Sequence, residues 1–218
     1  MSPTGGIVFL LDDEPGMLKA LTRLLKAEGF TVCAFTSAQA FLESYHPEAL
    51  SCLVLDVAMP GLNGLELQQR LTRSGVLLPI VFLTGHGDIP MSVQAIKAGA
   101  VDFLTKPVND ADLLRAVRAA LQRAAEQRDL IAETALLRQR YSSLTPREGE
   151  VMAHVVAGQL NKQVAGDLGI GEHTIKVHRA RVMQKMGVES LADLVRAAER
   201  LGLGKSAISG EGRVAGGG

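Results

Sequence analysis

The sequence lacks the features of a membrane, secreted or zinc-binding protein. Across its 218 residues, no apolar run approaches the roughly 18 residues that a spanning helix needs, and residues 1–6 have no signal-peptide character. Its two cysteines, Cys33 and Cys52, lie in apolar runs, which favours buried, reduced thiols. The five histidines are not spaced as zinc ligands. We therefore expect a globular, cytoplasmic protein with no membrane contact.

The chain also lacks a net charge. It has 23 basic and 23 acidic residues, which argues against nonspecific coating of DNA. The charges are unevenly distributed, because residues 1–123 carry a slight acidic excess. A local basic cluster is what a helix that reads a DNA groove needs. Such a cluster is formed by Lys176, Arg179, Arg181 and Lys185.

Residues 1–123 repeat one pattern, in which a short apolar run precedes a helix-length amphipathic segment. This alternation predicts a parallel sheet covered on both faces. Five strands in about 120 residues favour the flavodoxin-like order 2-1-3-4-5. The expected strands are 7–11, 31–35, 52–55, 80–83 and 101–104, and the expected helices are 15–28, 37–45, 64–74, 88–98 and 110–123.

The segment after the last strand differs from the rest because residues 110–139 contain no proline or glycine. It is predicted to form one long helix, or two helices broken near 124–130. We expect an α/β domain over 1–123, a helical linker over 124–142, an all-α domain of four helices over 143–204 and a disordered tail over 205–218.

Polar side chains stand at the ends of four predicted strands. In a doubly wound sheet, ligands bind beyond the carboxyl ends of the strands, where the strand order reverses. Several carboxylates there would repel one another, and Mg²⁺ relieves that repulsion. A carboxylate nucleophile can form an acyl phosphate, so carboxylates with a hydroxyl and an ammonium suit phosphoryl transfer. The candidate residues are Asp12, Asp13, Asp56, Thr84 and Lys106.

Each of these residues alone has an ordinary explanation. A single aspartate such as Asp56 at a strand end is usually a turn cap, and the Lys106-Pro107 pair alone is an ordinary turn. The coincidence of polar groups at four strand ends is what favours a phosphoryl-transfer site.

Residues 6–123 resemble the receiver domain of bacterial response regulators. The matching motifs are LDDE at 11–14, LDVAMPG at 55–61, TGHGD at 84–88 and KAGAVDFLTKP at 97–107. The resemblance implies that Asp56 accepts a phosphoryl group from a histidine of a sensor kinase. It also implies that Mg²⁺ is bound by Asp13, Asp56 and the backbone carbonyl of Ala58, with Asp12 acting through water.

The same resemblance implies how the domain switches. Lys106 is expected to contact the phosphoryl oxygens, Thr84 to move toward the phosphoryl group and Phe103 to turn inward behind it. The peptide before Pro107 is expected to be cis. Phe103 stands where tyrosine is common. Phosphorylation adds about −1.5 to −2 charges and is expected to promote dimerisation, although ordinary packing and solvation also account for the residues concerned. These are Met91, Val93, Ile96, Lys97, Asp102 and Arg118.

Residues 143–203 are predicted to contain a helix-turn-helix. Thr145 is the expected cap of a first helix, with Pro146 and Glu148 in its first turn. Asn161 is expected to cap the next helix, and Gly187 to end the third. A short helix, a glycine-containing turn and a longer helix place the longer one in the major groove. The last three helices are expected over 162–168, 172–186 and 191–201.

The longer helix has two faces. Ile175, Val182, Met183 and Met186 form the core side, with Arg179 near it, whereas Lys176, Val177, Ala180, Arg181 and Gln184 lie opposite. Small apolar side chains between cations suit thymine methyl groups and base edges, although a solvated basic face is the alternative. The expected DNA-binding residues are Asn161, Lys162, Thr174, Lys176, Val177, Arg181 and Lys185.

This second domain resembles the LuxR/FixJ-type output domain, most specifically in NKQVAGDLGI at 161–170 and HTIKVH at 173–178. Two positions depart from the usual pattern: Gly171 replaces a capping serine, which weakens the cap, and Leu191 replaces a common arginine.

Together the two resemblances imply a phosphorylation-dependent transcription regulator that is not an enzyme. Its expected partners are a sensor histidine kinase, promoter DNA, RNA polymerase and a second copy of the chain. Two alternatives are an interaction or phosphate-sink protein that no longer reads DNA, and a small phosphohydrolase working through an aspartyl phosphate.

Overall fold

The computed structural model describes residues 6–46, 49–85 and 89–203, with the side chains of 89–92 excepted. It divides into two compact units, Met1–Asp129 and Leu130–Gly218. The predicted tail over 205–218, residues 86–88 of the TGHGD motif and the side chain of Met91 lie outside this description. Among the described helices, none combines the length and apolar character that a membrane crossing requires.

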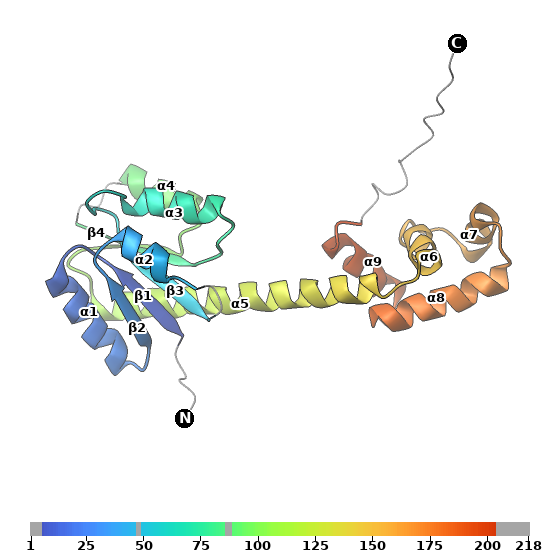
Figure 1. The fold of residues 1–218 in the computed structure, drawn as a ribbon, viewed down its shortest axis with the longest axis horizontal. Helices are drawn as coiled ribbons and strands as arrows, with labels where there is room; N and C mark the ends of the chain where they lie inside the picture. Colours follow the sequence, from blue (N-terminus) through green and yellow to red (C-terminus); the bar gives the residue numbers. More distant parts are fainter. Residues whose placement is uncertain (1–5, 47–48, 86–88, 204–218) are drawn as a thin grey trace, which may run out of the picture. The chain divides into compact units, whose positions relative to one another are not determined.

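The first unit contains a five-stranded parallel sheet in the order β2-β1-β3-β4-β5 (Figure 1), which confirms the predicted topology. The strands are β1 (Ile7–Leu11), β2 (Thr31–Phe35), β3 (Ser51–Asp56), β4 (Ile80–Thr84) and β5 (Asp102–Thr105). The helices between them are α1 (Pro15–Ala27), α2 (Ala38–Ser44), α3 (Gly64–Arg73) and α4 (Ile89–Lys97).

Helices cover both faces of this sheet (Figure 1). Phe9 and Leu11 of β1 pack with residues of α2, α3 and α4, whereas Val8 and Leu10 pack with α1 and with the first part of α5 (Asp110–Ser142). Successive strand residues point to opposite faces, so a sheet buried on both sides requires the continuous apolar runs seen in the sequence.

Helix α5 contributes to both units. It is one unbroken helix, which decides between the two expectations for residues 110–139. Leu113 and Val117 are buried against the sheet of the first unit, and Leu137 and Tyr141 pack in the core of the second. The segment 124–142, expected as a linker, is therefore shared between the units.

The second unit contains the four predicted helices and also the last part of α5, which was expected to be a linker. The helix α6 begins with the expected capping box, because the Glu148 amide donates to Thr145 Oγ1 and the Thr145 amide donates to Glu148 Oε2. The helices are α6 (Pro146–Val156), α7 (Asn161–Leu168), α8 (Glu172–Met186) and α9 (Leu191–Arg200).

The predicted cap of α7 is wrong. The capping position is Leu160, and Asn161 is the first helical residue. The Leu160 amide donates to Gln163 Oε1 at 2.8 Å, so a side chain one turn into the helix satisfies this end. The Asn161 oxygen instead accepts a hydrogen bond from Arg179 of α8. Gly171 gives α8 no side-chain cap, as its departure from the usual serine predicted.

Candidate functional site

Three carboxylates meet at the carboxyl ends of β1 and β3. Asp12 and Asp13 directly follow β1, and Asp56 is the last residue of β3. One carboxylate oxygen from each of the three lies within 4.8 Å of the others. Asp12 and Asp56 are buried and Asp13 is exposed. The pairing of β1 with β3 in the sheet therefore brings together residues that are 44 positions apart, as predicted.

Lys106 connects two of these carboxylates. Its Nζ donates to Asp12 Oδ2 at 2.7 Å and to Asp56 Oδ2 at 2.9 Å, and Glu14 Oε1 lies 3.7 Å away. Burial alone would lower the pKa of Lys106, but the hydrogen bonds and charges of Asp12 and Asp56 outweigh it and raise the pKa. The lysine therefore stays protonated and holds the two carboxylates in place.

Backbone groups fix the second oxygen of each buried carboxylate. Asp12 Oδ1 accepts from the Glu14 amide at 2.8 Å, and Asp56 Oδ1 accepts from the Ala58 amide at 3.2 Å. The peptide between Lys106 and Pro107 is cis, as predicted. The Lys106 amide also donates to the carbonyl of Thr84 at 2.7 Å, which ties the lysine to the end of β4.

The charge balance of the cluster fits a divalent cation. Three carboxylates and one ammonium leave two negative charges. The oxygen atoms of Asp13 are exposed, while those of Asp12 and Asp56 are partly occupied by Lys106. Oxygen donors with a net negative charge are what Mg²⁺ requires, with water completing the shell.

Gly64 supports the site, and the sequence argument missed it. It is the first residue of α3, and its amide donates to the Val57 carbonyl at 3.1 Å. A Cβ at this position would lie 2.5 Å from the Asp56 carbonyl oxygen and 3.1 Å from the Phe82 ring. Only glycine therefore allows α3 to approach the end of β3 so closely. The available signal was a glycine at the first position of a predicted helix.

Thr84 and Phe103, the two residues of the expected switch, differ in how deeply they are buried. Thr84 is buried at the end of β4. Phe103 is half-buried in β5, and its ring centroid lies 6.0 Å from that of Phe82. Phe103 thus packs beside the core on the α2, α3 and α4 face of the sheet.

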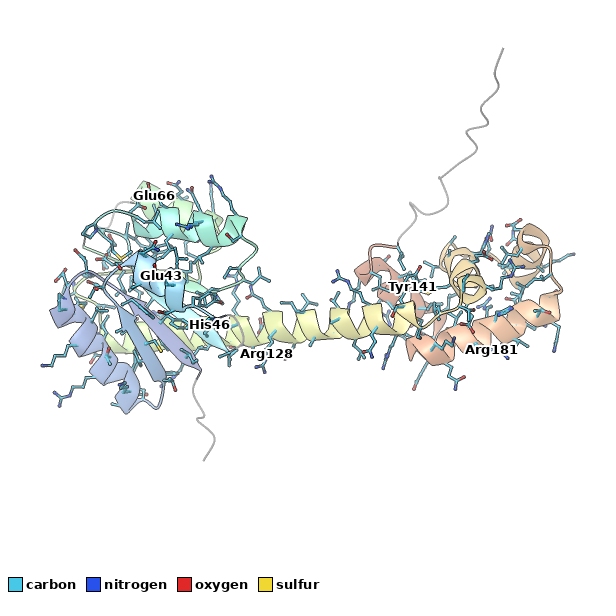
Figure 2. The ribbon with its side chains drawn as sticks, in the orientation of Figure 1. Glu43, His46, Glu66, Arg128, Tyr141 and Arg181 are labelled. Carbon is cyan, nitrogen blue, oxygen red and sulfur yellow. The ribbon has the colours of Figure 1, made fainter. Side chains whose placement is uncertain are left out.

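The second candidate site is the outer face of α8. Ile175, Val182 and Met186 are buried and Met183 is half-buried, as predicted. The opposite face is exposed and includes Arg181, which Figure 2 labels on α8. The exposed members of the predicted DNA-binding set are Lys162, Thr174, Lys176, Val177 and Arg181.

The two remaining members of that set have partners within the second unit. Asn161 Oδ1 accepts from Arg179 Nη1 at 2.7 Å. Lys185 Nζ donates to Glu148 Oε2 at 2.6 Å and to the Ser143 carbonyl at 3.0 Å. The hydrogen bond from Lys185, followed by that from the Thr145 amide, lowers the pKa of the buried Glu148 to about 2. These contacts were not foreseen from sequence.

Comparison with known families decides what the two sites belong to. Residues 8–118 match the response regulator receiver domain, and residues 142–198 match the luxR family of bacterial regulatory proteins. The chain belongs to the response regulators with a LuxR-type output domain. Phosphorylation-dependent regulation of transcription is the mechanism of this family, and its receiver domain implies a histidine kinase as partner.

Relatives of this response regulator match along nearly its whole length. Nodulation protein W of Bradyrhizobium diazoefficiens is 49% identical, and the match covers 92% of this chain and 88% of the relative. Response regulator protein TodT of Pseudomonas putida is 48% identical with the same coverage. Transcriptional regulatory protein FixJ of B. diazoefficiens is 42% identical, over 92% of this chain and 98% of FixJ.

Solved structures of similar regulators have the same two-part architecture. The response regulator StyR is 48% identical, with a TM-score of 0.77 over 89% of this chain and 98% of the StyR chain. Full-length FixJ from B. japonicum is 42% identical, with a TM-score of 0.55 over 91% of this chain and 98% of the FixJ chain.

Proposed function

We propose that Asp56 is the phosphoacceptor of this response regulator and that its phosphorylation controls DNA binding by the outer face of α8. The observation that carries the proposal is the cluster of Asp12, Asp13 and Asp56 within 4.8 Å, with Lys106 bonded to both buried carboxylates. A cluster with more carboxylates than cations is suited to accept a metal and a phosphoryl group.

In the proposed reaction, a carboxylate oxygen of Asp56 attacks the phosphorus of a phosphohistidine on the sensor kinase. The new P–O bond gives an acyl phosphate. The P–N bond breaks, its electron pair remains on the imidazole nitrogen, and the kinase histidine is regenerated. Lys106, 2.9 Å from Asp56 Oδ2, is placed to neutralise the incoming phosphoryl oxygens. Transfer happens once per regulator, so the protein is a substrate of the kinase and not a multiple-turnover enzyme.

The residues proposed to hold Mg²⁺ are Asp13, Asp56 and the backbone carbonyl of Ala58, with Asp12 acting through water. When bound, the ion neutralises charge on the phosphoryl oxygens. Asp13 is the exposed member of the cluster and so can offer its oxygens to an ion that arrives from solvent. The Ala58 amide already donates to Asp56, which fixes the loop that carries its carbonyl.

The proposed switch uses Thr84 and Phe103 to alter the α4–β5–α5 face. A shift of population from 1:99 to 99:1 needs about 5.5 kcal/mol, which new contacts of the phosphoryl group with Thr84, Lys106 and Mg²⁺ would supply. Val93 and Ile96 of α4 are 45% and 47% exposed, which supports dimerisation through this face. Lys97 is also exposed, whereas Arg118 pairs with Glu28 and Asp102 accepts from the Phe103 amide.

The proposed DNA contacts are the exposed residues of α7 and α8. Arg181 and Val177 would contact base edges and thymine methyl groups. Lys162, Lys176 and Thr174 would contact phosphates. Asn161 is the first residue of α7, next to Lys162, and its side-chain oxygen accepts from Arg179, while Lys185 is paired with Glu148. Both residues are proposed as further DNA contacts. Because its proposed partners are promoter DNA and RNA polymerase, the protein is proposed to act in the bacterial cytoplasm.

The test is a DNA-binding titration of the full-length protein with and without beryllofluoride, which mimics the phosphoryl group. The duplexes are one selected from random DNA by the protein and one scrambled control, each at several salt concentrations. We expect tighter, sequence-selective binding after beryllofluoride treatment, and an affinity that falls with salt. Equal affinity for both duplexes in both states would contradict the proposal.

A further inference from the structure

The last turn of the recognition helix α8 is bonded to the last turn of α5 and to Ser143, the residue that follows α5. Arg140 Nη1, from α5, donates to the Met186 carbonyl at 3.0 Å. In the opposite direction, Lys185 Nζ, from α8, donates to the Ser143 carbonyl at 3.0 Å. We call these two reciprocal hydrogen bonds the α5–α8 clasp. Both lie wholly within the second unit.

The clasp supplies a hydrogen-bond donor to a carbonyl at the C-terminus of α8. A helix leaves its last four carbonyls without intrahelical partners and carries partial negative charge at that end. The Val188 amide bonds the Met183 carbonyl and the Gly187 amide bonds the Gln184 carbonyl. The Met186 carbonyl receives a guanidinium N–H from Arg140 instead, a charge-assisted bond that also complements the helix dipole.

Gly187 makes room for the clasp. Its φ of 65° is a left-handed conformation that favours glycine. A Cβ at this position would also lie 2.5 Å from Arg140 Nη1 and 2.7 Å from its Cζ. The helix stop and the approach of the guanidinium therefore require the same small residue.

Further contacts hold α5 against the rest of the second unit. Leu137 is buried in the core that contains Val182 and Met186 of α8. Glu133 forms an ion pair with Arg200 of α9. This part of α5 thus moves with α8, because core packing and the clasp act on neighbouring turns.

We infer that Arg140 and Lys185 are positioning residues through which α5 sets the placement of the recognition helix. Residues 110–121 of the same helix pack in the receiver core, so α5 is the segment that joins the receiver to the helix held by the clasp. Lys185 orients the helix through this bond, in addition to its proposed DNA contact. The inference rests on the proposed function, because it concerns how the phosphorylation signal reaches DNA.

The test measures the response ratio, defined as DNA affinity with beryllofluoride divided by affinity without it, in the full-length protein. Arg140→Ala is compared with the wild type and with Arg138→Ala, which removes an exposed arginine of the same helix. Receiver occupancy by beryllofluoride is followed by ¹⁹F NMR. We expect Arg140→Ala to lower the response ratio about fivefold or more, with unchanged occupancy, and Arg138→Ala to keep the wild-type ratio.

If Arg140→Ala does not fold, Arg140→Met takes its place, since methionine keeps the apolar stem and removes only the donors. A folded Arg140 variant with the wild-type response ratio would overturn the inference and leave the clasp a purely stabilising contact. A wild-type protein that does not respond to beryllofluoride would instead overturn the proposed function.

Discussion

Each unit of the protein contains a nearly buried carboxylate bonded to a lysine, and the two centres differ in charge balance. In the output domain, Glu148 faces one lysine, Lys185, and also accepts from the Thr145 amide. In the receiver, Lys106 is shared between Asp12 and Asp56, with the exposed Asp13 beside them.

The difference separates a structural ion pair from a proposed phosphorylation site. Glu148 and Lys185 neutralise each other, and the Thr145 amide also donates to Glu148 Oε2, so this centre has no excess charge. The receiver cluster retains negative charge after Lys106 is counted, and that charge is compatible with a bound divalent cation. A buried carboxylate–lysine contact alone is therefore no sign of function, whereas an excess of carboxylates over cations is.

The largest effect is expected at Asp56, and it would show that the receiver centre is the reactive one. Asp56→Asn should abolish the covalent incorporation of phosphate from acetyl phosphate, because the carboxylate nucleophile is lost, while the circular dichroism spectrum stays unchanged. Intact-protein mass spectrometry measures the incorporation. Asp112→Asn, at an exposed aspartate paired with Arg115, is the control. Labelling retained in Asp56→Asn would place the nucleophile elsewhere.

A smaller effect is expected from reducing the carboxylate excess. Asp13→Asn should raise the Mg²⁺ concentration needed for half-maximal labelling by about 10- to 100-fold, similar to other losses at metal sites. The labelling rate is measured over a Mg²⁺ titration. Glu43→Gln on α2, an exposed residue labelled in Figure 2, is the control. An unchanged Mg²⁺ requirement in Asp13→Asn would mean that the cluster does not hold the ion.

In the output domain, removing the charge of the buried carboxylate Glu148 should affect stability and not reactivity. Glu148→Gln keeps the capping geometry but removes the charge, so it should cost about 2 kcal/mol of unfolding free energy at pH 7. The folded pKa of Glu148, about 2, lies below its ordinary value of 4.5. Its contribution is therefore full above about pH 4.5 and is lost as the pH falls toward 2.

Urea unfolding of the wild type, Glu148→Gln and the exposed control Glu150→Gln from pH 7 to pH 3 checks this sign. The difference between wild type and Glu148→Gln should shrink as the pH falls. A difference that is constant with pH would show that the ion pair is not its source.

The smallest effects are expected on the exposed basic face, where no buried partner is lost. Arg181→Ala should cost at least about 1 kcal/mol in binding to the selected duplex and relax specificity at one base pair. Lys162→Ala should weaken binding to all duplexes similarly and reduce the salt slope by about 1. Fluorescence anisotropy with single-base variants separates these outcomes. A uniform loss in Arg181→Ala would make Arg181 a phosphate contact.

The pattern of apolar runs and helical segments determined much of the fold. The predicted strands 7–11 and 31–35 coincide with β1 and β2. The central strand β1 is continuously apolar because it is buried on both faces, whereas the edge strand β2 is only partly buried. The acidic cluster was also predictable, since the carboxyl ends of adjacent parallel strands meet at one edge of the sheet. The capping box of α6 was predictable because it depends only on Thr145 and on Glu148, three residues later in the chain.

What the sequence could not determine were the partners of the long side chains. The bond from Lys185 to Glu148 was not predicted. Asn161 was expected to cap α7, but its side chain accepts a hydrogen bond from Arg179. Whether 110–139 was one helix or two was also undecided until the packing of α5 was known. A lysine or arginine side chain reaches several possible acceptors, and only the packing of separate helices brings one of them within bonding distance.

The Lys106 and Lys185 centres show which features the sequence determines and which depend on tertiary structure. The sequence determined that Asp12, Asp13 and Asp56 share one edge of the sheet, because strand direction and order settle this. Only the tertiary structure decided that Lys106 bridges two of them while Lys185 is bonded to Glu148 and Ser143. The reason is physical: backbone periodicity is set locally along the chain, whereas contacts between charged side chains depend on which distant elements pack together.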